Sequence, residues 1–152
     1  MPTVALRFSP LAEHVRTARL VAVSVARRAG FGEGQLDEIR IAIGEACARA
    51  VGRSPADGLV DMRLCDDDRR LEVTVLERRH DGAPLPPETE PEDPLALALL
   101  EGMADLVAVP GTTDDPREAG GEGGVLLSWQ LPPEEPADVP GAPLARASRY
   151  AR

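Results

Sequence analysis

The chain contains no lysine, only two cysteines and two histidines, and aromatic residues make up 3% of its 152 residues. Two cysteines and two histidines are too few for a disulfide scaffold or a zinc-finger pattern. No apolar run approaches the roughly 20 residues of a membrane span, and the residues after Met1 lack the pattern of a secretory signal. We therefore expect a cytoplasmic protein without membrane contact, whose core is aliphatic.

The length of the chain corresponds to about one domain. A hydrophobic fraction of 43% excludes disorder throughout the chain. After Leu131 the sequence contains five prolines and few large apolar residues. We therefore predict one folded domain over residues 1–131 and a flexible tail, rich in proline and alanine, over residues 132–152.

The net charge of −9 is unevenly distributed along the chain. Residues 1–53 contain eight arginines and five acidic residues, whereas residues 54–152 contain nine arginines and 21 acidic residues. Binding to nucleic acid requires a clustered basic face, so this composition argues against a direct nucleic-acid partner. The acidic part fits either a partner with basic patches or a solvated surface that confers solubility.

Hydrophobic periodicity predicts the elements of the first third of the chain. Residues 3–8 alternate apolar and polar side chains, which is typical of a half-buried strand. Ser9 and Pro10 are residue types preferred at an N-cap and at the first helical position, so we expect a helix to begin there and to end at the glycine-rich residues 30–34. The apolar face of a second helix consists of Leu36, Ile39, Ile43, Cys47 and Ala50. Cys47 is therefore expected in the core and not as a reactive thiol.

The remainder of the domain is predicted to contain a hairpin, a short helix and two further strands. These elements cover residues 60–64 and 71–75, then about 95–103, then 106–109 and 125–131. Asp93 and Pro94 form an N-cap and first-turn pair at the start of the short helix. Strands that arrive in adjacent pairs favour an α/β two-layer sandwich, with a mixed, mostly antiparallel sheet covered on one face by three helices.

Residues 37–51, with the sequence DEIRIAIGEACARAV, are the most informative segment. They resemble the N-box helix, roughly D-x-x-x-A-x-x-E-A-x-x-N-A-V, of the bacterial anti-sigma factor/serine kinases in the histidine-kinase-like (GHKL, Bergerat) ATPase superfamily. Ala42, Glu45, Ala46, Ala50 and Val51 match the motif, and Asp37 lies one position before its aspartate. The predicted element order is similar to that of the same family, so the resemblance extends over roughly residues 3–131.

The resemblance implies a function in the control of transcription. Family members bind a sigma factor, and many use Mg-ATP to phosphorylate a serine of an anti-anti-sigma protein of the STAS type. It also implies a homodimer, and a partner-facing surface that includes the first helix. The exposed arginines expected on that helix are Arg16, Arg19, Arg27 and Arg28, although a solvated helix face accounts for them equally well.

The positions implied to bind Mg-ATP depart from the family pattern at the N-box. The family's magnesium-binding asparagine corresponds to Arg49, whose guanidinium has no lone pair for a metal but could contact a phosphate. Glu45 matches the family's glutamate, which would act as base or orient the attacking group. Because Glu45 and Arg49 are four residues apart on one helix, an ion pair between them is the alternative that we favour.

The motifs implied to bind adenine and phosphate also differ from the family pattern. An Asp-x-Gly-x-Gly motif corresponds here either to Glu77, with Arg79 in place of a glycine, or to a gapped match at Asp81 and Gly82. The glycine-rich phosphate motif corresponds to residues 93–97, where Pro94 has no N–H to donate.

These departures lead to a hypothesis and two alternatives. The first hypothesis is an anti-sigma regulator that acts by binding a sigma factor, a STAS protein or both, with ATP binding lost or weakened and no cofactor. The alternative is an active serine kinase that uses ATP and Mg, with Glu45 as base. A third possibility is a kinase-like binding module for an unrelated signalling protein.

Overall fold

The structure is a computed structural model that describes residues 2–87, 93–109 and 123–133. The elements in chain order are β1 (Thr3–Phe8), α1 (Ala12–Ala29), α2 (Glu33–Arg53), β2 (Leu59–Asp67), β3 (Arg70–Arg78), α3 (Pro94–Met103), β4 (Leu106–Ala108) and β5 (Gly124–Gln130). This order confirms the predicted succession of strands and helices.

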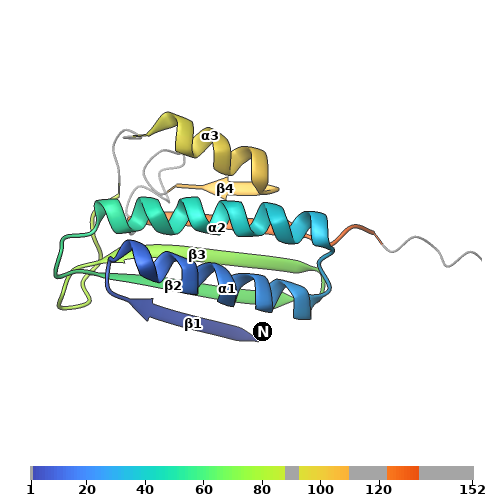
Figure 1. The fold of residues 1–152 in the computed structure, drawn as a ribbon, viewed down its shortest axis with the longest axis horizontal. Helices are drawn as coiled ribbons and strands as arrows, with labels where there is room; N and C mark the ends of the chain where they lie inside the picture. The colour runs from blue at the N-terminus through green and yellow to red at the C-terminus, as the bar shows by residue number, and fades with distance from the viewer. Residues whose placement is uncertain (1, 88–92, 110–122, 134–152) are drawn as a thin grey trace, which may run out of the picture.

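The described strands form one five-stranded sheet with the order β1-β2-β3-β5-β4. Every neighbouring pair is antiparallel, so the sheet contains no parallel pair among these strands. The three helices cover one face, with α1 over β2, α2 over β3 and α3 beside β4 (Figure 1). The predicted α/β two-layer sandwich is confirmed.

The core lies between the sheet and the helices, and it is aliphatic as expected. Alternate residues of β2 and β3 point into it, because side chains of a strand alternate between faces. Trp129 is also buried there, and its indole Nε1 donates to the Met103 carbonyl at 2.7 Å. Cys47 is fully buried on α2, and burial raises the pKa of its thiol to about 12.

The start of α1 differs from the prediction. The helix begins at Ala12, and its N-cap residue is Leu11, which makes no side-chain cap. Ser9 lies in a preceding turn, where its carbonyl accepts from the Leu11 N–H at 2.7 Å and from His14 Nδ1 at 3.0 Å. The predicted N-cap at Ser9 is therefore wrong. The Ser9 carbonyl takes part in this local turn, and the helix begins only at Ala12.

The end of α1 and the start of α3 follow the predicted signals. Gly30 ends α1 in a left-handed conformation with φ 98°, which glycine adopts without steric cost. At the start of α3, Asp93 accepts hydrogen bonds from the backbone N–H groups of Leu95 and Ala96. No helix in the described part of the chain is long and apolar enough to cross a membrane. The predicted tail lies, from residue 134 onward, outside the described residues.

Candidate functional site

A buried acid marks the end of β3 that faces α2. Leu71, Val73 and Val75 occupy the inward positions of this strand, and Glu77 continues the same alternation. Its side chain is fully buried, with 0% exposure. A carboxylate removed from water requires charged or hydrogen-bonding partners, so the groups around Glu77 define the chemistry of this site.

Two arginines of α2 supply those partners. Arg49 Nη1 lies 3.6 Å from Glu77 Oε1, and Arg53 Nε donates to Glu77 Oε2 at 3.1 Å. The two arginines are four residues apart, so they lie on one face of α2 and reach the same carboxylate. Their side chains are 12% and 17% exposed, which makes this a largely desolvated ion cluster.

The ion pair expected between Glu45 and Arg49 is not formed. Among the described residues no ion pair joins them, and Arg49 is directed instead toward Glu77 on the sheet. The physical reason is burial: a half-exposed glutamate on the same helix gains little from pairing, whereas a buried carboxylate needs a counter-charge.

The backbone around residue 123 packs closely against Glu77. A Cβ atom at Gly123 would lie 2.9 Å from Glu77 Oε2 and 2.8 Å from the Pro86 carbonyl oxygen. The Gly123 N–H donates to the Leu85 carbonyl at 2.8 Å, and the Leu85 N–H donates to the Glu77 carbonyl at 3.2 Å. A glycine at 123 therefore permits the close approach of three chain segments around Glu77.

A cavity of about 330 Å³ remains between the last turns of α2 and the start of α3. Its lining consists of Glu45, Ala48, Arg49, Gly52, Arg53, Asp93 and Ala96. The structure thus brings together the N-box residues and the residues that match the phosphate motif.

The donor set of this cavity does not fit a magnesium ion. Mg²⁺ prefers oxygen ligands, but Arg49 and Arg53 present positive charge and no acceptor. The carboxylates that line the cavity are those of Glu45 and Asp93, and Asp93 Oδ1 already accepts the two N-cap hydrogen bonds of α3. The described part of the chain contains no group of three or more His, Cys, Asp or Glu side chains that could hold a metal.

Asp81 and Gly82, the gapped match to the adenine motif, lie apart from this cavity. They form a turn after β3 in which Asp81 Oδ1 accepts from the Ala83 N–H at 3.0 Å and Gly82 has φ 83°. Neither residue lines the cavity beside α3. Of the two matches considered from the sequence, only Glu77 contacts the N-box helix.

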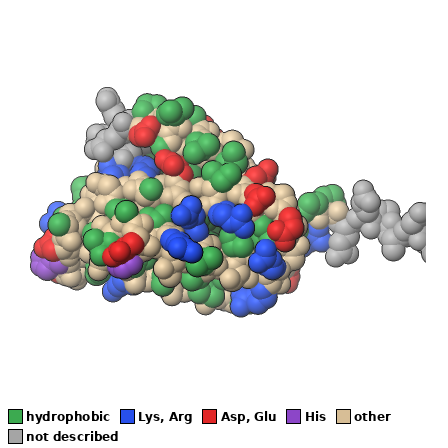
Figure 2. Space-filling view, in the orientation of Figure 1, with side chains coloured by type: hydrophobic (Ala, Val, Ile, Leu, Met, Phe, Trp, Pro, Cys, Tyr) green, Lys and Arg blue, Asp and Glu red, His purple; other side chains and the backbone are tan. Residues whose placement is uncertain are grey.

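The four arginines predicted on the first helix are all exposed, but only two of them form ion pairs with residues that the structure describes. Arg27 pairs with Glu33 at 3.3 Å, and Arg28 pairs with Asp66 at 3.0 Å. No ion pair or hydrogen bond joins Arg16 or Arg19 to the residues that the structure describes. Basic side chains gather over α1 and α2 on the face shown in Figure 2.

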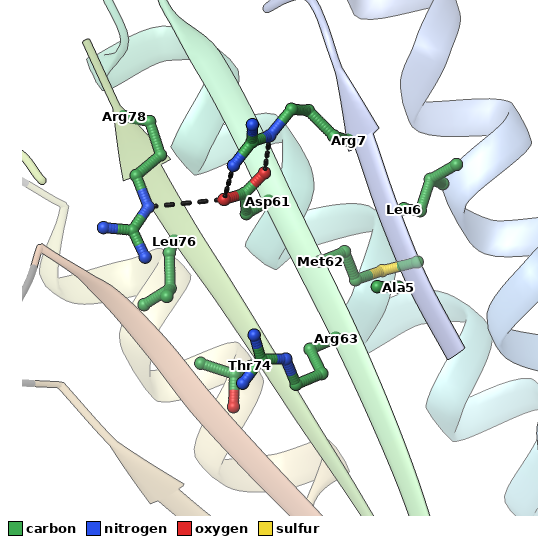
Figure 3. Close-up of a pocket in the computed structure, with 9 residues that line it drawn as sticks. All are labelled: Ala5, Leu6, Arg7, Asp61, Met62, Arg63, Thr74, Leu76 and Arg78. Atoms are coloured by element: carbon green, nitrogen blue, oxygen red, sulfur yellow. Dashed lines mark hydrogen bonds and ion pairs between the residues drawn. The ribbon is translucent and has the colours of Figure 1, made fainter. Parts of the chain in front are cut away.

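A second hollow, of about 410 Å³, lies on the sheet face opposite the helices. Asp61 of β2 is its centre: Arg7 donates to both carboxylate oxygens, at 2.5 and 2.8 Å, and Arg78 lies at 3.3 Å (Figure 3). The hydrogen bond from Arg7 is the largest cause that holds the pKa of Asp61 below its ordinary value. Because Arg7 is well exposed, this cluster belongs to the solvated surface.

Sequence reasoning missed Arg53 and Gly123 as parts of the site. The spacing of Arg49 and Arg53 was a signal for a shared face, but no pattern within α2 identifies Glu77 as their partner. Gly123 lies in a glycine-rich run of the sequence just before β5, and nothing in that run indicates that it packs against Glu77.

Comparisons with known proteins agree with this architecture. Residues 8–121 match the family model of the histidine kinase-like ATPase domain. The chain is 31% identical over 113 residues to the serine-protein kinase RsbW of Bacillus velezensis, a match that covers 64% of this chain and 71% of that protein. RsbW of Bacillus subtilis is 30% identical over the same shares. RsbW of Bacillus pumilus is 34% identical over 71 residues, 43% of this chain and 44% of that protein.

The chain therefore belongs to the histidine kinase-like ATPase family. Within it, the chain groups with the serine-protein kinases named RsbW. The resemblance drawn from residues 37–51 is confirmed.

Proposed function

We propose that this protein is an anti-sigma regulator that acts by binding other proteins, with Mg-ATP binding lost or much weakened. Its proposed partners are a sigma factor and an anti-anti-sigma protein of the STAS type, in the cytoplasm. The observation that carries the proposal is the ion cluster of Arg49, Arg53 and Glu77. In this cluster Arg49, at the position of the family's metal-binding asparagine, pairs with Glu77, at a candidate adenine-binding position. Both positions are therefore engaged with each other instead of being available to a nucleotide.

The electrostatics of the cavity support weak nucleotide binding. A metal ion at the position of Arg49 would be repelled by the guanidinium, and it would have to displace an ion pair that neutralises a buried carboxylate. At α3, Pro94 removes one backbone donor, and the Asp93 carboxylate accepts two of the N–H groups that an anion would need. Each effect opposes the binding of a phosphate–metal complex.

Exposed arginines on α1 support a partner-binding role. Arg16 and Arg19 are the stronger candidates, because Arg27 and Arg28 are held in ion pairs within the chain. The proposed homodimer, which follows from the family, remains a prediction that sedimentation equilibrium can test.

A second candidate function is an active serine kinase, and the position of Glu45 favours it. This residue is partly exposed and lines the cavity beside Arg49, where it could accept a proton from a serine hydroxyl. In that case Arg49 would contact a phosphate directly.

Thermal denaturation with nucleotide separates the two functions. A ligand present at about 100 times its Kd stabilises a protein by about 2.7 kcal/mol, so a binding-competent kinase melts several degrees higher in millimolar Mg-ATP. We expect no shift for this chain, with RsbW of Bacillus subtilis as the matched positive control. A clear magnesium-dependent shift, followed by phosphate transfer to a STAS protein, would favour the kinase.

Binding assays with purified sigma factors and STAS proteins of the same organism test the partner class. We expect at least one to form a complex in size-exclusion chromatography without nucleotide. Binding to none of them would leave the third possibility, a module for an unrelated signalling protein.

A further inference from the structure

The two edges of the sheet differ in how they are protected against pairing with another strand. At one edge, β4 has three residues, and a short edge strand offers little for pairing. At the other edge, β1 has six residues and pairs with β2 in an unbroken register from Thr3 to Phe8, without a bulge or an internal proline (Figure 1). Among the described strands, β1 therefore presents the longer and less protected edge.

The backbone groups at this edge belong to alternate residues of β1. The Pro2 carbonyl accepts from the Asp66 N–H at 3.3 Å, so the backbone groups of the even-numbered residues face β2 in this antiparallel pair. The N–H and C=O groups of the odd-numbered residues point away from β2. For Ala5 and Arg7, the described part of the chain provides no hydrogen-bond partner on that side. These groups are a template for a further strand.

The side chains of β1 leave this edge clear. Arg7 is the charged residue of the strand, and it points toward Asp61 on β2, to which it donates at 2.5 and 2.8 Å (Figure 3). A charged side chain can protect a sheet edge, but this one is held over β2 instead. On the helix side, Val4 and Leu6 are half-buried and pack against the core. A strand placed beside β1 would cover both of these apolar side chains.

We infer that β1 pairs antiparallel with β1 of a second copy of the chain, with Ala5 at the two-fold axis, and that the two sheets thereby form one continuous sheet. This inference rests on the proposed homodimer, to which it assigns an interface. A strand that pairs antiparallel with its own copy generates two-fold symmetry, which is the commonest symmetry of homodimers.

The register follows from the residues that present backbone groups at the edge. Because these residues are odd-numbered, they must oppose one another across the axis. With Ala5 opposite Ala5 of the second copy, Thr3 lies opposite Arg7, and Val4 lies opposite Leu6. This register brings apolar side chains together on the helix side and opposes no like charges. A shift of two residues in either direction would leave Arg7 or Thr3 opposite a residue outside β1.

The first experiment removes a backbone donor at the edge. Proline is tolerated in an edge strand where its missing N–H would face outward, so Ala5→Pro spares the pairing of β1 with β2. The same substitution removes a donor at the two-fold axis and places the proline ring in the interface. Ala5→Val is the matched control, because it keeps the N–H and has a higher β propensity.

Sedimentation velocity of the full chain over a series of concentrations measures the dimer Kd, and circular dichroism verifies that each variant is folded. We expect the wild type and Ala5→Val to sediment as dimers with Kd values within about twofold of each other. Ala5→Pro is expected to weaken the dimer by about tenfold or more.

Cysteine cross-linking tests the register directly. Residues that exchange hydrogen bonds in an antiparallel pair have Cα atoms about 5.5 Å apart, which is within the reach of a disulfide. The half-buried Cys65 is first replaced by serine, whereas Cys47 is buried and can stay. In this background we expect Ala5→Cys to form a covalent dimer under mild oxidation. Thr74→Cys, on the outer sheet face, is expected to remain a monomer on a denaturing gel.

The negative outcomes are distinguishable. If the wild-type chain is a monomer, the proposed homodimer fails and the inference fails with it, while the binding of regulatory partners is tested separately. If the chain is a dimer and folded Ala5→Pro dimerises with wild-type affinity, the inference alone is wrong. A covalent dimer of Thr74→Cys without one of Ala5→Cys would assign the contact to the outer sheet faces and would also overturn it. If Ala5→Pro does not fold, the cross-linking result decides.

Discussion

The arginines on the two sides of α2 differ in burial and in pairing. On the side facing β3, Arg49 and Arg53 are largely buried and share the carboxylate of Glu77. On the side facing α1, Arg19 and Glu45 line an open groove together with mainly apolar residues, and Arg16 is exposed on α1; neither arginine has an ion-pair partner among the described residues. Charged groups that are paired within the chain leave little for a charged ligand to bind, whereas exposed arginines without an ion-pair partner in the described part of the chain favour association with another protein.

The largest difference between the two sides is expected when Glu77 is removed. Glu77→Ala leaves two largely buried guanidinium groups without their shared counter-charge, and we expect a loss of about 3–5 kcal/mol in the free energy of unfolding. Arg16→Ala, on the exposed surface of α1, should change that free energy by no more than about 0.5 kcal/mol. Urea denaturation of both variants measures the difference. Equal effects would show that the ion cluster is not a buried structural unit.

Two glycines sharpen the comparison, since each lies beside a charged side chain. In Gly123→Ala the new methyl group meets the Pro86 and Leu85 carbonyls as well as Glu77, so we expect about 1–3 kcal/mol of destabilisation. In Gly44→Ala it meets only the flexible side chain of Arg19, which can move aside.

Gly44→Ala also gains helix propensity, so we expect no destabilisation and up to about 1 kcal/mol of stabilisation. Thermal melts of both variants provide the measurement. A strongly destabilised Gly44→Ala variant would mean that Arg19 is fixed in place and cannot adapt to a partner.

The Asp61 cluster on the outer sheet face provides a reference for solvated charge. Interaction with Arg7 lowers the pKa of Asp61 in the folded state, so its stabilising contribution is present above the unfolded pKa of about 4 and is lost as the pH falls through the folded value. Because Arg7 is exposed, the contribution is expected to be below about 1 kcal/mol.

Comparing the wild type with Asp61→Asn by urea denaturation at pH 7 and at progressively lower pH measures this contribution. The difference in unfolding free energy should shrink as the solution becomes acidic. A difference independent of pH would indicate that the carboxylate charge contributes nothing and that only packing was changed.

Local patterns determined most of the fold, because they depend on contacts a few residues apart. The alternation in residues 60–64 and 71–75 predicted the hairpin, and Asp93 and Pro94 predicted the start of α3. The same reasoning failed at Ser9, where a turn with His14 competes with the helix cap. Within the site, it identified Glu45, Arg49 and Glu77 as candidates, but it paired Arg49 with the wrong carboxylate.

The sequence by itself determined the layered α/β architecture, the family and the substitution of arginine for the N-box asparagine. Only the tertiary structure decided that Arg49 and Arg53 share Glu77, that Gly123 packs against Glu77, and that Arg19 lines a groove between α1 and α2. The physical reason is separation along the chain. Arg49 and Glu77, 28 positions apart, meet only when α2 packs on the sheet, and Glu77 and Gly123, 46 positions apart, meet only when β5 pairs with β3. Which carboxylate an arginine prefers depends on the burial that this packing creates.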